Sequence, residues 1–429
     1  MLHDHLRNEF VKALRHELKP ALGCTEPISL ALCSAIASRY LGASPERIEA
    51  KVSPNLMKNG MGVTVPGTGM VGLPIAAAVG ALGGDPDAGL EVLRAVSAEQ
   101  VRAAKAMLDE KRVTVGLAET SLALYAESCV SHGADKVRVC IADSHTRVVC
   151  IEKNGETVFQ IDAEAGAADA LPYSLADATA ADVFEFAMTV PLASVDFVLQ
   201  AASLNSALAD AGMSGDFGLH IAATMQRNVD HGLLSDDLLT RIVKRSAAAS
   251  DARMGGAVLP AMSNSGSGNQ GIMATIPVVV VAEHLRADQA TLTRALTLSH
   301  LMAVYIHDHL PKLSALCAVT TAAMGAAAGM AWLLGGDQRT VSMAICSMIG
   351  DLAGMICDGA SNSCAMKVST SASSAYKAVL MALDNSRVAH YEGIVAESVD
   401  ESIANLCALA SRGMVQTDRQ IIEIILNKC

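Results

Sequence analysis

Three cysteines occupy positions that suit a reactive or metal-binding thiolate. Cys24 lies three residues before Pro27, and a proline in the first turn indicates that a helix begins there. The unpaired amides and the positive dipole end of that helix would stabilise a thiolate. Cys317 opens an uncharged segment, and Cys357 lies between two nearby glycines that leave room for a bulky inorganic group. All three positions therefore favour thiolate chemistry.

The spacing of the cysteines excludes the common structural zinc site. Cys364 follows Cys357 by seven residues, and the chain has no Cys-x-x-Cys pair, so a zinc knuckle is not expected. The spacing of bacterial ferredoxins is absent as well. Cys24, Cys317 and Cys357 remain as three dispersed thiolates that could hold an iron-sulfur cluster with one open iron. The alternative is that each of them is an ordinary buried thiol.

Two polar, glycine-rich segments are candidates for binding the charged groups of a small substrate. The first, residues 55–72, carries many backbone amides and suits a small carboxylate. The second, residues 263–271, offers hydroxyl and amide groups in a loop before an apolar run. The alternative interpretations are a turn between a strand and a helix for the first, and a helix-capping linker for the second. The candidate binding residues are Lys58, Asn59, Gly60, Ser265, Ser267, Asn269 and Gln270.

Three further patterns do not support a site of their own. Residues 67–72 match Gly-x-Gly-x-x-Gly, but no second strand ending in a ribose-binding acid follows them, so a nucleotide site is not favoured. The pair of histidines in 307–309 would face different ways on a helix, which indicates a solvated helix end. Residues 143–145 are no catalytic triad, because triad members meet in space rather than in sequence.

The composition limits the partners and the compartment. The chain has 429 residues, of which 51% are hydrophobic and 18% charged, and its formal net charge is −12. This charge disfavours nucleic acid or an anionic membrane as a partner. Because the charged fraction is below the ~25% of ordinary domains, we expect further burial in a homo-oligomer, as a dimer. The N-terminus lacks the apolar core of a secretory signal, so we expect a cytoplasmic protein with reduced cysteines.

The periodicity of apolar residues predicts an α+β protein with a large all-α unit and a smaller mixed α/β unit. We expect N-terminal helices over 1–44 that pack on the helical unit, a mixed domain over 45–165 and an all-α domain over 166–429. Asn154 and Gly155 predict a two-residue hairpin turn. The uncharged segment 313–336 is rich in Ala and Gly, which indicates a buried helix rather than a membrane span.

Five motifs together resemble a known family. They occur in the order GCTEP, KNGMGVTVPGTG, SGSGNQG, KLSALC and MICDGASNSCAMK, and they cover the chain from residue 23 to residue 367. The chain thereby resembles the iron-sulfur L-cysteine desulfidases, which are distant relatives of the α chain of iron-sulfur L-serine dehydratases. Matched motif by motif, the resemblance implies a 4Fe-4S cluster that is held by Cys24, Cys317 and Cys357, with its fourth iron open to substrate.

The resemblance implies β-elimination of a small amino acid without pyridoxal phosphate. L-Cysteine would give sulfide and aminoacrylate, which hydrolyses to pyruvate and ammonia, and an open iron would act as a Lewis acid toward the substrate sulfur. The protein must supply a base for the α-proton, for which Lys58 and Glu26 are candidates. Two alternatives stay open: a serine or related amino-acid dehydratase that uses the same cluster, and a non-catalytic amino-acid sensor.

Overall fold

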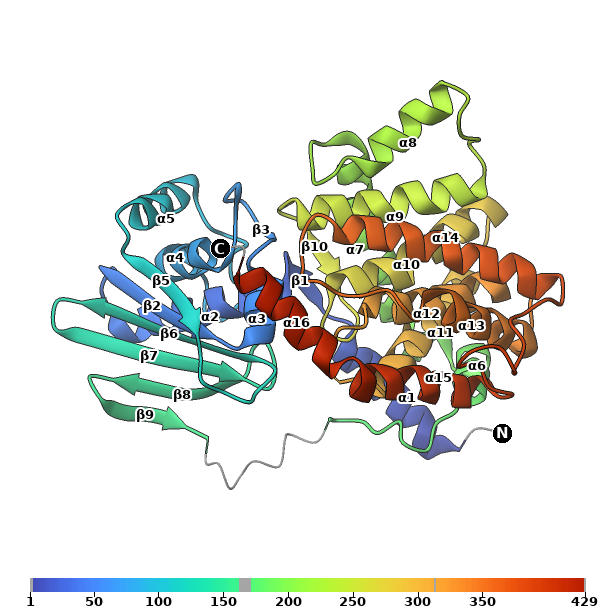
Figure 1. Ribbon diagram of the computed structural model, residues 1–429, viewed down its shortest axis with the longest axis horizontal. Coiled ribbons are helices and arrows are strands. Elements are labelled where there is room, and N and C mark those ends of the chain that lie inside the picture. Colours follow the sequence, from blue (N-terminus) through green and yellow to red (C-terminus); the bar gives the residue numbers. More distant parts are fainter. Residues whose placement is uncertain (1–2, 162–170, 312–313, 428–429) are drawn as a thin grey trace.

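The computed structural model describes residues 3–161, 171–311 and 314–427. Figure 1 shows a smaller unit built on a sheet beside a larger unit built of helices. This arrangement confirms the predicted α+β class. The predicted boundary between residues 165 and 166 lies outside the described residues.

The smaller unit contains a six-stranded sheet in the order β5-β2-β6-β7-β8-β9. Strands β2 and β5 pair in parallel, and the other neighbours are antiparallel. The β8–β9 turn has φ of 55° at Asn154 and 85° at Gly155, which confirms the predicted hairpin. The strands are β2 (Arg47–Val52), β5 (Val113–Leu117), β6 (Tyr125–His132), β7 (Asp135–Ala142), β8 (Val148–Lys153) and β9 (Glu156–Gln160).

Strand β6 was not foreseen from the sequence. It reads YAESCVSH, in which small and polar residues weaken the apolar alternation that marks a strand. Its buried positions nevertheless alternate with partly exposed ones, because one face of the sheet is covered and the other is open. Residues 125–132 therefore form a strand because they pair with β2 on one side and with β7 on the other.

Helices cover one face of the sheet (Figure 1). Helices α2 (Thr25–Leu41) and α4 (Leu73–Gly83) contact its strands, and α5 (Ala98–Asp109) packs on α4. Helix α2 ends at Gly42 in the left-handed conformation. Helices α2 and α4 pack closely, since a Cβ on Gly80 would lie 2.3 Å from the carbonyl oxygen of Ala31. Residues 66–69 form the turn between β3 (Thr64–Val65) and β4 (Met70–Val71), and Gly72 is the N-cap of α4, so the glycines of 67–72 serve a hairpin and a helix start. The short helices α3 (Pro54–Gly60) and η1 (Gly89–Glu91) complete this unit.

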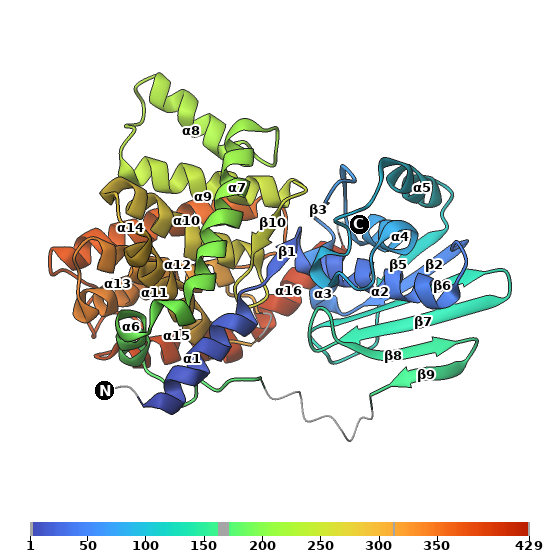
Figure 2. The ribbon, with the colours of Figure 1, turned by 180° about the vertical axis from the view of Figure 1, so that it is seen from behind.

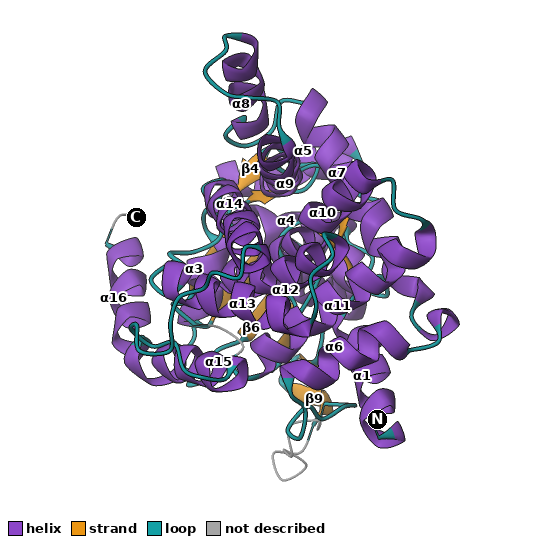
Figure 3. Ribbon diagram, turned by 90° about the vertical axis from the view of Figure 1, so that its right-hand side faces the viewer, coloured by secondary structure: helices purple, strands orange, loops and turns teal. Residues whose placement is uncertain are grey.

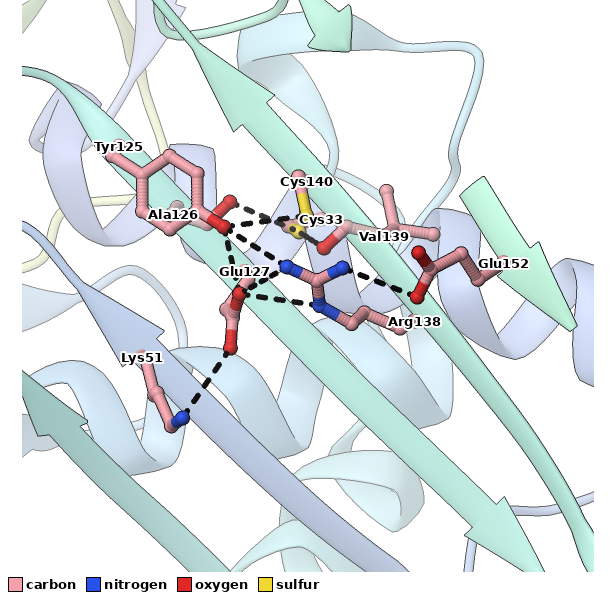
Figure 4. Close-up of polar contacts among 9 residues, drawn as sticks. All are labelled: Cys33, Lys51, Tyr125, Ala126, Glu127, Arg138, Val139, Cys140 and Glu152. Atoms are coloured by element: carbon pink, nitrogen blue, oxygen red, sulfur yellow. Dashed lines mark hydrogen bonds and ion pairs between the residues drawn. The ribbon is translucent and has the colours of Figure 1, made fainter. Parts of the chain in front are cut away.

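The open face of the sheet carries a polar cluster (Figure 4). The guanidinium of Arg138 donates to Glu127 Oε2 at 2.8 Å from Nη2, to Glu152 Oε2 at 3.1 Å from Nη1 and to Tyr125 Oη at 3.3 Å. Its Nε donates to Glu127 Oε2 at 3.2 Å. Each guanidinium nitrogen of Arg138 thus has a partner within the protein.

The larger unit packs its helices around α12 (Ala318–Leu333), which lies near the centre in the end-on view of Figure 3. A Cβ on Gly325 would lie 2.3 Å from the carbonyl oxygen of Ser299 on α11, so small residues permit this packing. No helix among the described residues is long and apolar enough to cross a membrane. The surrounding helices are α6 (Ala180–Thr189), α7 (Leu199–Ser214), α8 (Ile221–Asp230), α9 (Leu238–Met254), α10 (Gly268–Leu285), α11 (Gln289–Asp308), α13 (Gln338–Leu352), α14 (Cys364–Leu383) and α15 (Val399–Ala408), with the short helices η3 (Leu192–Ser194), η4 (Asp196–Val198) and η5 (Leu409–Gly413).

Both ends of the chain connect the two units. Helix α1 (Asp4–Glu17) lies along the helical unit in Figure 2 and contributes Phe10 and Leu14 to its core, whereas α2 packs on the sheet. The predicted placement of the N-terminal helices on the helical unit thus fits α1 and not α2, because the buried face of α2 is complementary to the sheet. Between the units, β1 (Pro20–Leu22) pairs with β10 (Pro260–Met262), and α16 (Val415–Leu426) crosses back toward α3.

Candidate active site

A cavity of about 130 Å3 lies where the two units meet. The smaller unit, including the start of α2, supplies one wall. Loops and helix ends of the larger unit supply the rest. Nine of the eleven residues predicted from the sequence line it. They are Cys24, Glu26, Asn59, Ser265, Ser267, Asn269, Gln270, Cys317 and Cys357.

Four helices begin at this cavity. Cys24 is the N-cap of α2, Ser267 that of α10 and Cys317 that of α12, while Cys364 is the first residue of α14. Unpaired amides and the positive dipole end of each helix attract anions. The cavity is therefore suited to negatively charged groups such as thiolates or a carboxylate.

Cys317 and Cys357 are brought together by a short antiparallel bridge between the segments that carry them. The amide of Cys317 donates to the carbonyl oxygen of Met355 at 2.9 Å, and the amide of Cys357 donates to that of Ala315 at 2.7 Å. Backbone hydrogen bonds fix both residues in position. The side chain of Cys364 lines the same cavity, which adds a fourth thiol to the three predicted ones.

Burial disfavours the thiolate form of Cys24, Cys317 and Cys364 in the cavity. Burial, followed by the carboxylate of Glu26, raises the pKa of Cys24 well above its ordinary value. Burial and the neighbouring Cys357 raise the pKa of Cys317 to about 12. The predicted stabilisation of a Cys24 thiolate by its helix is therefore outweighed by loss of solvent and by the nearby Glu26. A bound metal would have to displace the protons of these thiols.

The thiols of the cavity have the donor chemistry that an iron-sulfur cluster uses. Within residues 3–161, 171–311 and 314–427, no three His, Cys, Asp or Glu side chains are grouped to hold one metal ion. Each thiolate of an iron-sulfur cluster binds a different iron, so its ligands stand further apart. Cys24, Cys317, Cys357 and Cys364 share one cavity and offer the soft sulfur ligands that iron-sulfur clusters require.

Glu26 is held in place by neutral donors. Its side chain is 7% exposed, its Oε2 accepts from Cys24 Sγ at 3.0 Å and from Thr25 Oγ1 at 3.1 Å, and its Oε1 accepts from Asn59 Nδ2 at 3.1 Å. Among the described residues it has no cationic partner within ion-pair distance. A fixed carboxylate with no counter-charge can take up a proton from a bound molecule.

Several buried polar atoms of the lining lack a partner among the described residues. They are Asn59 Oδ1, Arg253 Nε, Gln270 Oε1 and His307 Nδ1. A buried polar group without a hydrogen bond costs about 1–3 kcal/mol. Since these atoms surround one cavity, a polar ligand would satisfy them together.

A buried network supports the loop at residues 263–267. The amide Nδ2 of Asn264 lies 3.1 Å from His300 Nδ1, and His300 Nε2 lies 3.1 Å from Thr275 Oγ1. Thr275 donates to the carbonyl oxygen of Gly271 at 2.6 Å, and Asn205 Nδ2 donates to Thr275 at 2.9 Å. These contacts require a neutral His300 whose Nε2 carries the proton. Burial lowers the pKa of His300 to about 3, which agrees with that state.

Sequence reasoning missed Arg253, His145 and His307, all of which line the cavity. His145 reaches it from the β7–β8 connection, where a Cβ on Gly266 would lie 3.8 Å from His145 Cε1. Burial lowers the pKa of His307 to about 4, so His307 is neutral. The predicted solvated helix end fits Asp308 and His309, which are more exposed than His307. No local signal distinguishes the three lining residues, because each depends on how distant segments meet.

Lys58 and Gly60 are the two predicted residues that the structure does not bring into the lining. The Nζ of Lys58 pairs with Asp418 Oδ1 of α16 at 2.6 Å, and its side chain is 1% exposed. A Cβ on Gly60 would lie 2.4 Å from Leu73 Cδ2, so this glycine permits close packing against α4. Both residues lie beside Asn59, which does line the cavity.

Comparison with known proteins gives the same family relation as the motifs. A protein from Chromobacterium violaceum named "UPF0597 protein" is 68% identical over 98% of this chain and 97% of its own length. A "UPF0597 protein" of Yersinia enterocolitica is 62% identical over 98% and 97%, and the "UPF0597 protein YhaM" of Escherichia coli is 59% identical over 99% and 98%. The family model described as serine dehydratase alpha chain matches residues 87–423. The chain therefore belongs to the serine dehydratase alpha-chain family.

Proposed function

We propose that this chain is an iron-sulfur-dependent L-cysteine desulfidase that eliminates sulfide from L-cysteine. Membership in the serine dehydratase alpha-chain family indicates a lyase of the dehydratase or desulfidase kind. The observation that carries the proposal is that Cys24, Cys317 and Cys357, which are remote in the sequence, line one cavity together with polar loop residues.

Cys24, Cys317 and Cys357 would hold a 4Fe-4S cluster, and Cys364 is a further thiol within the same cavity. When bound, such a cluster supplies an open iron that acts as a Lewis acid toward the substrate sulfur. The helix ends at the cavity favour the negative charge of the thiolates. The reaction then requires no pyridoxal phosphate.

Glu26 is the better placed of the two candidate bases, because it lines the cavity and Lys58 does not. Its carboxylate would take the proton from Cα of L-cysteine. The electron pair of that C–H bond forms the Cα–Cβ double bond as the Cβ–S bond breaks, and sulfide leaves with the bonding pair. Aminoacrylate tautomerises and is hydrolysed by water to pyruvate and ammonia. Asn59 would orient Glu26 through its 3.1 Å hydrogen bond.

Anaerobic reconstitution tests the proposal. The protein should take up about four irons per chain and release sulfide from L-cysteine at catalytic protein concentrations. Iron, acid-labile sulfide, pyruvate and released sulfide would be measured on one preparation. Undiminished activity after complete removal of iron would contradict the proposal.

A serine dehydratase that uses the same cluster is a second candidate, because the matching family model is described as serine dehydratase alpha chain. The two reactions differ only in the leaving group, which is sulfide from L-cysteine and water from L-serine. We expect kcat/KM for sulfide release from L-cysteine to exceed that for pyruvate formation from L-serine. The reverse order would assign the dehydratase activity.

A further inference from the structure

Arg253 is a buried guanidinium that has no anionic partner among the described residues. It lies in the last turn of α9, lines the cavity and is 3% exposed. Its Nη1 donates only to the sulfur of Met254, at 3.3 Å, and its Nε has no partner in the part of the chain that the structure describes. No described carboxylate lies within ion-pair distance of it. A buried charge without a counter-charge is costly in free energy, so a ligand anion is the natural partner.

The fold holds this guanidinium against the start of α10. A Cβ on Gly268 would lie 2.2 Å from Arg253 Nε and 2.8 Å from its Cζ, so any larger residue at this position would displace the Arg253 side chain. Arg253 therefore adjoins the N-terminal turn of α10, whose N-cap is Ser267. The arginine charge and the dipole end of this helix give one wall of the cavity a positive potential.

The opposite wall does not neutralise Arg253. Among the described residues, Glu26 is the one carboxylate that lines the cavity, and its two oxygens accept from Cys24, Thr25 and Asn59. In the wall of Arg253, the side chain of Asn269 is fixed by Ser250. The guanidinium thus stays available to a molecule in the cavity.

We propose that Arg253 binds the α-carboxylate of the substrate, which makes α-amino acids with a free carboxylate the substrate class. This assignment rests on the proposed function. An arginine fork binds a carboxylate through two parallel hydrogen bonds. The contact would fix Cα relative to Glu26 and stabilise the negative charge that develops as the α-proton leaves.

The reconstituted Arg253→Gln and Arg253→Lys variants test this contact with two substrates. For Arg253→Gln, kcat/KM for L-cysteine should fall about 100-fold, as expected when a charge-assisted bidentate hydrogen bond is lost. For L-cysteine methyl ester, which lacks the carboxylate charge, it should change less than about threefold. Arg253→Lys should recover part of the loss. The matched control is Arg245→Gln on the same helix, where the native arginine pairs with Glu283 at 2.6 Å. Equal losses for both substrates would overturn the assignment.

Binding to the metal-free protein gives a readout that does not depend on turnover. L-Alanine, which has no leaving group, should raise the melting temperature of wild-type protein and not that of Arg253→Gln, and L-alaninamide should raise neither. Stabilisation of both proteins by L-alanine would overturn the proposal. After anaerobic reconstitution, the iron content of the two proteins should be equal. Loss of iron from Arg253→Gln would instead show that the arginine supports the thiolates that bind the cluster.

The two proposals fail in different ways. If iron-loaded wild-type protein releases no sulfide while L-alanine binding still depends on Arg253, the desulfidase proposal fails and the carboxylate site stands. If wild-type protein turns over L-cysteine and Arg253→Gln has the same KM and kcat, the carboxylate site fails alone.

Discussion

Arg138 and Arg253 are two arginines with contrasting surroundings. On the open face of the sheet, Arg138 donates to Glu127, Glu152 and Tyr125 and leaves no nitrogen unpaired (Figure 4). At the cavity, Arg253 donates to the sulfur of Met254 and to no other described residue. A satisfied charge stabilises the fold, and an unsatisfied buried charge reduces stability unless a ligand pairs with it. The contrast separates a structural polar cluster from a binding site.

Replacement of the cavity thiols should have the largest effect. Cys24→Ser, Cys317→Ser and Cys357→Ser should each lose bound iron and reduce sulfide release at least about 1000-fold, because the Lewis acid is lost. Iron content and activity would be measured after identical reconstitution. Cys150→Ser on β8 is the control from the sheet and should match wild-type protein.

Cys364→Ser decides which three thiols act as ligands. Retention of iron in this variant supports the predicted set. If Cys364→Ser loses iron and one of the other three variants retains it, Cys364 is a ligand in place of the cysteine replaced in that variant.

Variants of Glu26 and Lys58 should affect different properties, kcat in the first case and the free energy of unfolding in the second. Glu26→Gln should lower kcat about 1000-fold, which is typical of the loss of a general base, with the iron content unchanged. Lys58→Gln should lower the free energy of unfolding by about 3–5 kcal/mol, because Asp418 loses its buried partner. Its kcat should stay close to that of wild-type protein, as measured below its unfolding transition. A loss of kcat in Lys58→Gln, with Glu26→Gln still active, would assign the role of the base to Lys58 instead of Glu26.

Acid should destabilise the protein through His300, which is fully buried and neutral. Burial lowers its pKa to about 3 in the folded state, so between pH 6.5 and 3 the unfolded chain binds a proton that the folded protein does not. The contribution of His300 to stability is therefore complete above pH 6.5 and falls with decreasing pH, by about 2 kcal/mol between pH 7 and 5. Urea unfolding at these two pH values measures the difference.

His300→Gln is the variant that tests this contribution. It should reduce the difference in unfolding free energy between pH 7 and 5, since glutamine does not titrate. His231→Gln, at an exposed position on the surface, should leave the difference as in wild-type protein. An unchanged difference in His300→Gln would show that acid acts through other groups.

The smallest effect is expected on the sheet, where it sharpens the contrast between the two arginines. Arg138→Gln should lower the free energy of unfolding by about 1–2 kcal/mol, because Glu127 and Glu152 lose charge-assisted hydrogen bonds at a partly exposed site. Arg253→Gln should melt at or above the temperature of wild-type protein in the absence of ligand. Melting curves of the two variants would be compared under the same conditions. A lower melting temperature for Arg253→Gln than for Arg138→Gln would contradict the contrast between the two arginines.

The sequence by itself determined the local features of this protein. The start of α2 after Cys24 follows from Pro27 and its end from Gly42, and the hairpin at Asn154 follows from turn chemistry, because such signals act between close neighbours. The motifs likewise identified nine residues that line the cavity. The expected cytoplasmic homo-dimer without nucleic acid stays a prediction.

Only the tertiary structure decided which side chains share the cavity. Arg253, His145 and His307 reach it from three separate elements, while Lys58 pairs instead with Asp418 near the end of the chain. Helix α2 lies on the sheet for a similar reason, since its partner surface forms from strands later in the sequence. Whether a buried charge finds a partner depends on packing between distant segments, and local patterns do not contain that information.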